Sequence, residues 1–346
     1  MKILGIFLLF ILITASLTKT TGQISYFQYN TIRHNDFSFP IFNRTEDSTT
    51  TLKINQLLQL SELDLLYGYQ KNNLFEAVSV DPGTIYGGKV RMAYQIFSNT
   101  DKVLSVKFDN SSCGATCAYW VRYYNFNAGN GDLIQLKDCF TVDGFVSFNK
   151  HVVNKRTAKF KKELKKVNPE FRDDLNDVFG RFDQDDLTDY YIKDSMIVID
   201  GENSLFKNQK GFNLDMYTKF YLSEFKDYLN DFGRAVFGIT DDSMSGYRSS
   251  ALPQLFEGAI DTSLQIILVL NYDYENKMRG VYAYKKYGRG IFIDGELNND
   301  TLTLIEYNDD FDINGHIDAR YDGFSIDGTW SNKDETKMLT IIAKRR

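Results

Sequence analysis

The stretch GIFIDGELNNDTLTLIEYNDDFDINGHIDARYDGFSIDGTW, residues 290–330, decides the fold class of the C-terminal part of the chain. Short runs in which apolar and polar residues alternate follow one another along it, and clusters of Asn, Asp and Gly separate these runs. Alternation is typical of strands with one buried face, and such clusters are typical of tight turns between antiparallel strands. The pattern predicts an antiparallel meander that forms a small barrel or a sandwich.

The predicted meander extends beyond this stretch in both directions. Residues 262–270 are too short an apolar run to span a membrane and are predicted to form a buried strand. We interpret the polar segment around residues 240–253 as a domain boundary, so the β-meander domain is predicted over residues 252–346. Its other strands are expected at residues 279–284, 290–297, 301–307, 311–317, 323–330 and 338–342.

Upstream, strand-like and helical patterns follow one another, which predicts a mixed α+β domain over residues 23–245. Residues 23–50 are polar and predicted to be irregular. Strands are expected at residues 90–97, 102–109 and 118–126, and helices near residues 52–65, over residues 150–180 and over residues 214–232. The expected fold class is therefore α+β: an N-terminal domain with an antiparallel sheet and three helices, then a C-terminal all-β meander.

The N-terminus carries the features of a secretory signal peptide. Lys2 provides a positive start, residues 3–17 are mostly apolar, and Thr20 and Gly22 place small residues before a cleavage site. We predict a signal peptide over residues 1–22 and a secreted or periplasmic protein without a stable membrane span after cleavage. An uncleaved signal anchor is the alternative, although the apolar run is shorter than the roughly 20 residues that a spanning helix needs.

Composition narrows the possible functions. The 346 residues carry a formal net charge of −6, and loss of residues 1–22 would remove two lysines and no acidic residue. An acidic chain argues against a nucleic-acid partner. The three histidines are far apart, and no nucleophile elbow, phosphate loop or zinc-protease motif occurs. We therefore expect a binding protein without a cofactor, and the alternative is a hydrolase of envelope glycans or esters that uses unidentified carboxylates.

The three cysteines allow at most one intramolecular disulfide. Cys113 and Cys117 are four residues apart, and a bridge between them would close a small loop at a hairpin tip. Cys139 is then expected to be buried as a small apolar residue. A zinc site is the weaker interpretation, because no second pair and no nearby histidine accompany these cysteines.

A possible calcium loop lies within the meander. Asp310, Asp312 and Asn314 match its first positions, and Asp318 falls at the ninth position. The twelfth position carries Tyr321 where the loop normally has glutamate, and the flanks look like strands. The alternative is a strand whose polar residues face water. A barrel that binds calcium or a small ligand is thus a further candidate function.

Two other groups of residues are candidates for binding a partner. The segment 155–166 contains seven basic residues, among them Lys159 and Lys162, which would suit an anionic partner. The alternative is the solvated face of an amphipathic helix. The second group consists of Tyr119, Trp120 and Tyr123 in the strand predicted at residues 118–126.

Several short motifs are distributed over roughly residues 36–238: FPI at 39–41, KIN at 53–55, residues 104–108, CGATCAYW at 113–120, YYNF at 123–126, residues 131–140, Gly144, YIKD at 191–194 and the helix expected at 214–232. In these motifs the chain resembles a widespread bacterial envelope domain of unknown function. That domain also forms the extracellular, lysozyme-binding part of an anti-sigma factor, and a related module precedes the catalytic domain of some peptidoglycan deacetylases. The tail is similar to the β-meander of many secreted bacterial proteins, and residues 328–332 (GTWSN) resemble one strand of biotin-binding barrels.

The resemblance implies a non-enzymatic binding module of the bacterial cell envelope. Its partner would be a wall-acting protein such as lysozyme, or a cell-wall glycan. The resembled domain has no agreed catalytic residues, so the resemblance assigns none here. It directs attention to Tyr119, Trp120 and Tyr123, which lie inside the matched segments.

Overall fold

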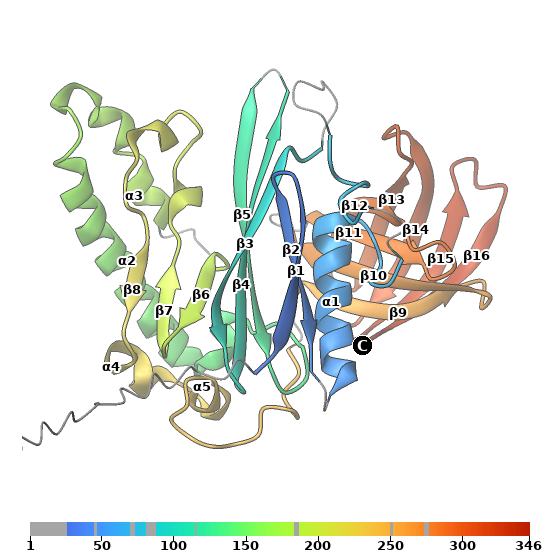
Figure 1. The fold of residues 1–346 in the computed structure, drawn as a ribbon, viewed down its shortest axis with the longest axis horizontal. Coiled ribbons are helices and arrows are strands. Elements are labelled where there is room, and N and C mark those ends of the chain that lie inside the picture. The colour runs from blue at the N-terminus through green and yellow to red at the C-terminus, as the bar shows by residue number, and fades with distance from the viewer. Residues whose placement is uncertain are drawn as a thin grey trace, which may run out of the picture.

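The computed structural model describes residues 26–346 except 45–46, 70–72, 81–87, 115, 183–186, 250–251 and 273–276. The predicted signal peptide, residues 1–22, lies outside the described residues. The described chain forms a five-stranded sheet, a three-stranded sheet and a closed eight-stranded barrel (Figure 1). The predicted α+β class is confirmed, with mixed structure in the N-terminal part and antiparallel β-structure in the C-terminal part.

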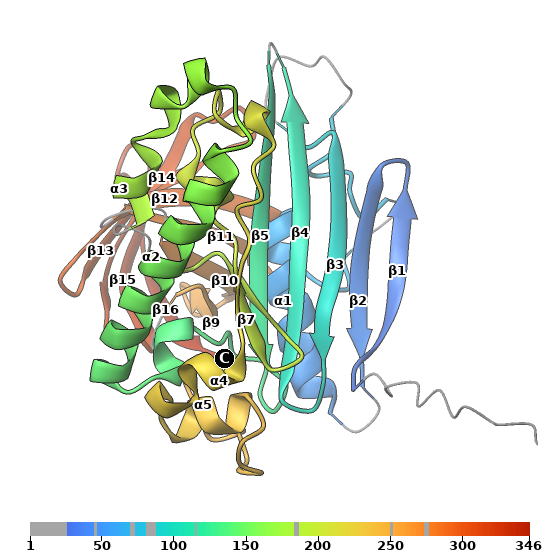
Figure 2. The same ribbon diagram turned by 90° about the vertical axis from the view of Figure 1, so that its left-hand side faces the viewer.

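The five-stranded sheet has the order β1-β2-β3-β4-β5, which is also the order of the strands along the chain (Figure 2). All neighbours are antiparallel except β2 and β3, which meet in a parallel pair between Phe37 and Met92. The strands are β1 (Gln28–His34), β2 (Phe37–Asn43), β3 (Arg91–Asn99), β4 (Val103–Cys113) and β5 (Cys117–Asn127).

The β1–β2 hairpin corrects the prediction that residues 23–50 are irregular. Phe37, Phe39 and Phe42 are buried in the main core, and this burial stabilises a short strand that polar neighbours surround in the sequence. Pro40 lies inside β2, although proline normally argues against a strand. Tertiary burial therefore outweighs the local pattern here.

Helix α1 (Ser48–Leu63) lies between the five-stranded sheet and the barrel (Figure 1). Its Leu57 and Leu58 belong to the same buried cluster as Phe108 of β4 and Ile267 of the barrel. The helix starts where the Asp47 carboxylate accepts hydrogen bonds from the backbone N–H groups of Thr49 and Thr50, a regular N-cap. One face of the sheet is thus covered by a helix that also supports the barrel wall.

The opposite face of the sheet is covered by a second layer. Helix α2 (Val142–Leu164) and the sheet of β6 (Tyr190–Lys193), β7 (Met196–Ile199) and β8 (Thr218–Phe220) share a buried cluster with Val103 of β4. The short helices of this part are α3 (Val178–Arg181), α4 (Leu222–Phe225) and α5 (Asp231–Val236), with 3-10 turns at Leu136–Cys139, Pro169–Phe171, Asp173–Leu175, Glu202–Ser204, Lys210–Phe212 and Lys226–Tyr228.

The helix predicted over residues 214–232 is wrong. The segment holds strand β8, helix α4 and a 3-10 turn, and helix α5 begins only at its end. Helix α5 begins at this point because Asn230 caps it. The Asn230 side chain accepts the backbone N–H of Gly233 and donates to the carbonyl oxygens of Asp138 and Phe140. Gly233 fits there because a Cβ atom would lie 1.9 Å from the carbonyl oxygen of Cys139.

The predicted meander is an eight-stranded antiparallel barrel, closed by pairing of the last strand with the first. Its interior is filled by one apolar cluster that includes Phe256, Ile293 and Ile341. The strands are β9 (Gln254–Ile260), β10 (Leu264–Tyr272), β11 (Lys277–Tyr284), β12 (Gly290–Asn298), β13 (Thr301–Tyr307), β14 (Ile313–Tyr321), β15 (Ser325–Asn332) and β16 (Met338–Arg345). Over the described residues, no helix has the length and apolar character needed to cross a bilayer.

Candidate functional site

A row of three aromatic rings lies between the five-stranded sheet and the three-stranded sheet. Phe97 of β3 stacks on Tyr191 of β6, with ring centroids 3.7 Å apart and an interplanar angle of 13°. Tyr191 in turn lies 5.9 Å from Tyr123 of β5 at an angle of 19°. All three side chains are half-buried. The row joins a buried polar cluster at one end to an open cavity at the other.

The Tyr123 end of the row is fixed by a buried carboxylate. The Tyr123 hydroxyl donates to Asp200 Oδ2 at 2.7 Å, and Asp200 Oδ1 accepts the backbone N–H of Glu202 at 2.9 Å. Asp200 is only 2% exposed. Burial, followed by the negative charge of Asp200, raises the pKa of Tyr123 far above its usual range. Tyr123 is therefore a protonated donor that joins the two layers rather than a free surface group.

The Phe97 end opens into a cavity of about 410 Å³. Three segments that are distant in the sequence line it: the β3–β4 turn from Ser98 to Lys102, the β6–β7 turn at Asp194 and Ser195, and the end of α5 from Val236 to Gly238. Val103, Ile192 and Phe237 provide an apolar floor, since each is at most 3% exposed. The cavity thus combines an apolar base, an aromatic ring and a polar rim.

The rim carries two unused carboxylates. Asp101 and Asp194 both line the cavity, and among the described residues neither carboxylate has a hydrogen-bond or ion-pair partner. The turn that carries Asp101 is fixed, because Thr100 Oγ1 accepts the backbone N–H groups of Lys102 and Val103. Lys102 reaches away to the backbone oxygen of Asp242 at 3.1 Å. The rim therefore offers acceptors for a ligand with several donors.

The three aromatic residues singled out in the sequence do not form one surface. Side chains alternate along a strand, so Tyr119 and Tyr123 face the three-stranded sheet and Trp120 points the opposite way. Trp120 shares its face with Arg122, which donates to the carbonyl oxygen of Ser61 in α1. Tyr119 is 70% exposed and Trp120 is half-buried.

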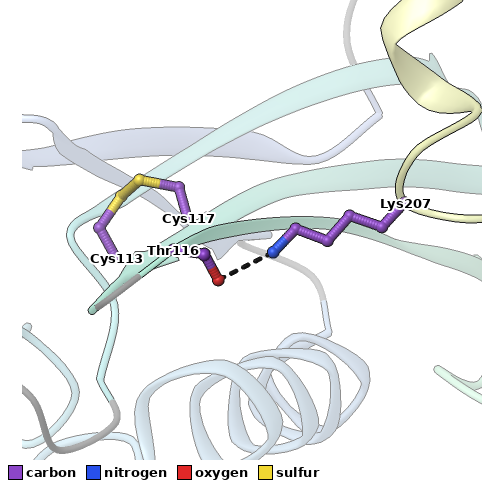
Figure 3. The surroundings of a disulfide bond; sticks show 4 residues. All are labelled: Cys113, Thr116, Cys117 and Lys207. Atoms are coloured by element: carbon purple, nitrogen blue, oxygen red, sulfur yellow. Dashed lines mark hydrogen bonds between the residues drawn. A yellow bond between two sulfur atoms is a disulfide. The ribbon is translucent and has the colours of Figure 1, made fainter.

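The tip of the β4–β5 hairpin is closed by a disulfide between Cys113 and Cys117, which are opposite each other in the strand register (Figure 3). Lys207 Nζ donates to Thr116 Oγ1 at 2.9 Å and ties the tip to the second layer. The remaining cysteine, Cys139, is buried, and burial raises the pKa of its thiol. β4 runs from the cavity at Val103 to this tip at Cys113, so the two features lie at opposite ends of the strand.

Reduction of this disulfide is expected to have a modest effect on stability. The closed loop is very short, so loop entropy contributes about 2 kcal/mol, at the lower end of the usual range for disulfides. A Cys113→Ser/Cys117→Ser variant should remain folded, and chemical denaturation followed by circular dichroism measures the difference. A loss above roughly twice that value would show that the tip is held by more than chain entropy.

β5 is the last strand of its sheet and one edge is largely unpaired. Near its C-terminal end, Asn125 O accepts Ile134 N and Asn127 N donates to Asp132 O. Toward the tip, no described residue makes a backbone hydrogen bond to the outer side of residues 119–123. Unpaired edge groups can accept an added strand from another polypeptide.

The basic segment is partly neutralised within the chain. Lys159 forms an ion pair with Asp215 at 2.8 Å, and Lys155 pairs with Glu224 at 2.6 Å. Arg156 is buried and donates to Ser204 Oγ at 2.9 Å. Lys162 is exposed on α2. On helix α2, Lys162 therefore faces solvent, whereas Lys155, Arg156 and Lys159 bind other elements of the second layer.

The residues of the possible calcium loop serve other contacts. Asn308 Oδ1 accepts the backbone N–H groups of Asp310 and Asp312, both at 2.9 Å. Asn314 donates to the Glu306 carboxylate, and Asp318 lies within β14 opposite Thr303 and Thr329. Within the described part of the chain, no group of three or more His, Cys, Asp or Glu residues is arranged to hold a metal ion.

No sequence pattern indicates a functional role for Phe97, Asp101, Asp194 or Asp200. Asp101 and Asp194 occupy hairpin turns, where aspartate is common for conformational reasons alone. Phe97 lies at the end of a predicted strand in a chain with 27 phenylalanines. Only the packing of the β6–β7 hairpin against β3 and β4 brings these residues to one place.

No protein-family model and no curated protein matches the sequence. Among solved structures, the crystal structure of a member of the DUF3298 family from Bacteroides fragilis is similar to this chain, with a TM-score of 0.41 and 12% sequence identity. The match covers 63% of this chain and 99% of that chain. The neighbour represents a bacterial family without an assigned function, and it does not test the resemblance to the anti-sigma factor or to the deacetylases.

Proposed function

We propose that the chain is an exported, non-enzymatic binding module of the bacterial cell envelope, and that the cavity beside Phe97 binds a cell-wall glycan. The observation that carries this proposal is the cavity itself, in which the free carboxylates of Asp101 and Asp194 stand above an apolar floor. Its volume of about 410 Å³ is within the range of small-ligand sites.

The chemistry of the lining suits a sugar. Sugar hydroxyl and acetamido groups are hydrogen-bond donors, and the two carboxylates are acceptors in fixed turns. The apolar faces of sugar rings pack on aromatic side chains, and the half-buried Phe97 is available for this contact.

Two further features agree with export. The N-terminal segment has the pattern of a signal peptide. The disulfide at the hairpin tip would persist in an oxidising compartment such as the periplasm or the extracellular medium. A cell-wall glycan is present in both locations.

Soluble peptidoglycan fragments titrated into the full mature chain, residues 23–346, test the proposal by calorimetry. We expect binding by the wild type and a loss of at least roughly tenfold in affinity for Phe97→Ala and for Asp101→Asn combined with Asp194→Asn, because contacts of this kind contribute about 1.4 kcal/mol or more. Tyr119→Ala is the matched control, since it removes an aromatic side chain far from the cavity. Absence of binding, or equal losses in the control, would contradict the proposal.

A second candidate partner is a wall-acting protein such as lysozyme. The free outer edge of residues 119–123, with exposed Tyr119, could take an added strand. Lysozyme is basic and this chain is acidic, so attraction should weaken as salt increases. In the same calorimetric series, lysozyme binding that falls with salt and is lost in Tyr119→Ala but kept in Phe97→Ala would support this partner.

A further inference from the structure

In the described part of the barrel, a buried acidic residue, Glu306, lies at one end of a largely apolar core. Glu306 follows Leu302 and Leu304 on the inward face of β13, and all three are at most 2% exposed. Its carboxylate accepts the Tyr282 hydroxyl at 2.5 Å and the Trp330 indole N–H at 2.6 Å through Oε2. Oε1 accepts the side-chain amide of Asn314.

No cation balances this carboxylate. All three donors are neutral groups, and no described lysine, arginine or histidine forms an ion pair with Glu306. Hydrogen bonds from neutral donors lower the cost of burying a charge but do not cancel it. Two other buried carboxylates, Glu62 and Asp132, each have cationic partners, whereas Asp200 is held, like Glu306, by neutral donors. Glu306 is therefore a buried carboxyl group without a cationic partner among the described residues.

The end of the barrel that holds Glu306 is not sealed. The inward-facing residues around it, Tyr284, Ile291, Trp330 and Leu339, are only partly buried, although the cluster they belong to is otherwise fully buried. Tyr287, in the β11–β12 turn at the same end, is 64% exposed, and its ring lies 6.3 Å from that of Tyr284. Aromatic rings thus lead from solvent toward the carboxylate.

Asn314 is the most exposed of the three donors, since Trp330 is half-buried and Tyr282 is buried. Tyr282 and Trp330 come from within the barrel wall and hold Oε2, whereas Asn314 covers Oε1 from the rim. A ligand N–H group could therefore replace the Asn314 amide at Oε1 without disturbing the two inner hydrogen bonds.

We propose that this end of the barrel binds a small molecule with a primary ammonium group. The ammonium group would donate to Glu306 Oε1 and supply the missing positive charge, and the rings of Trp330 and Tyr284 would contact its carbon atoms and its charge. Because apolar side chains fill most of the interior, the ligand would occupy only the partly exposed end beside Glu306. The site is independent of the glycan cavity.

Paired probes test this proposal on the full mature chain. Glucosamine and n-butylammonium carry the ammonium group, and N-acetylglucosamine and n-butanol are their uncharged counterparts. We expect the two ammonium probes to bind by calorimetry and to raise the melting temperature, because a ligand of the native state stabilises it. The uncharged counterparts should bind at least tenfold more weakly at this site. Equal binding of charged and uncharged probes would overturn the proposal.

Two variants locate the binding. Glu306→Gln keeps the shape and the hydrogen-bonding oxygen but removes the charge, so ammonium binding should fall at least tenfold. Asn314→Ala removes the amide that occupies Glu306 Oε1, so ammonium binding should be kept or strengthened. This variant keeps the hydrogen bonds of Tyr282 and Trp330 to Glu306, so it tests the proposal even if Glu306→Gln does not fold. Phe97→Ala should bind the ammonium probes as the wild type does. Failure of the wild type and of Asn314→Ala to bind either ammonium probe would overturn the proposal.

Discussion

Replacement of Glu62 by glutamine is expected to lower the free energy of unfolding by about 3–5 kcal/mol, the usual cost of breaking a buried ion pair from one side. The Glu62 side chain is fully buried at the end of α1. Lys89 Nζ donates to Oε2 at 2.9 Å, and the Tyr124 hydroxyl and Arg122 donate to Oε1 at 2.7 Å and 3.3 Å. Glutamine would leave Lys89 buried without its countercharge.

The same variant should change the pH dependence of stability. Burial alone would raise the pKa of Glu62, but the charges of Lys89 and Arg122 outweigh burial and lower it from 4.5 to about 2. A lowered folded-state pKa stabilises the fold fully above the unfolded value, and this contribution is lost as pH falls from about 4.5 toward 2.

Urea denaturation between pH 2.5 and 7 measures both effects. The wild type should lose more stability than Glu62→Gln as the pH falls through this interval, because glutamine does not titrate. Asp300→Asn is the control, since its ion pair with Arg320 is exposed and contributes little. Parallel pH curves for the wild type and Glu62→Gln would refute this account of the network.

Replacement of Asp132 by asparagine is expected to have an effect of similar size, about 3–5 kcal/mol, for the same reason. Its carboxylate joins Lys53 of α1 to Arg345 of β16, with Oδ2 2.6 Å from the Arg345 guanidinium. The three side chains are at most 7% exposed. Without the negative charge, Lys53 and Arg345 would lie buried side by side and repel each other.

The position of Asp132 makes this variant informative about the whole molecule. It links the helix that covers the five-stranded sheet to the last strand of the barrel, which lies far along the chain. Arg248→Ala is the control, because Arg248 contacts the same carboxylate at 3.5 Å but is half-exposed. Denaturation followed separately by far-UV circular dichroism and by tryptophan fluorescence should show a lower midpoint for Asp132→Asn and a nearly unchanged one for Arg248→Ala. Equal midpoints for the two variants would contradict the assigned role.

The barrel was the most predictable part of the fold. Apolar and polar residues alternate regularly along its strands, and turn residues such as Asn298 and Gly323 mark the strand ends. Both signals are local in the sequence. The sequence does not distinguish a closed barrel from a sandwich, because the pairing of β9 with β16 across some 80 residues leaves no local pattern. The strand pairs around β4 were predictable for the same local reasons.

The predictions for residues 23–50 and 214–232 were wrong because the structure of these segments depends on tertiary contacts. β2 is held by buried phenylalanines despite Pro40, and the segment 214–232 is divided by contacts of Thr218 with β7 and of Asn230 with the backbone near Phe140. The cavity is still harder to predict from the sequence, because the three segments that line it meet only in the folded chain. Composition and spacing could not indicate Asp101 or Asp194, because ordinary turns use the same residues.

Hydrogen–deuterium exchange of the mature chain with and without a soluble peptidoglycan fragment tests the central proposal most directly. We predict slower exchange in the three segments that line the cavity, residues 98–103, 194–195 and 236–238, because a bound ligand suppresses local opening there. Exchange at residues 117–123 and at the barrel end around Glu306 should stay the same. Protection confined to those other regions, or no protection at a saturating concentration, would contradict the assignment of the cavity as the glycan site.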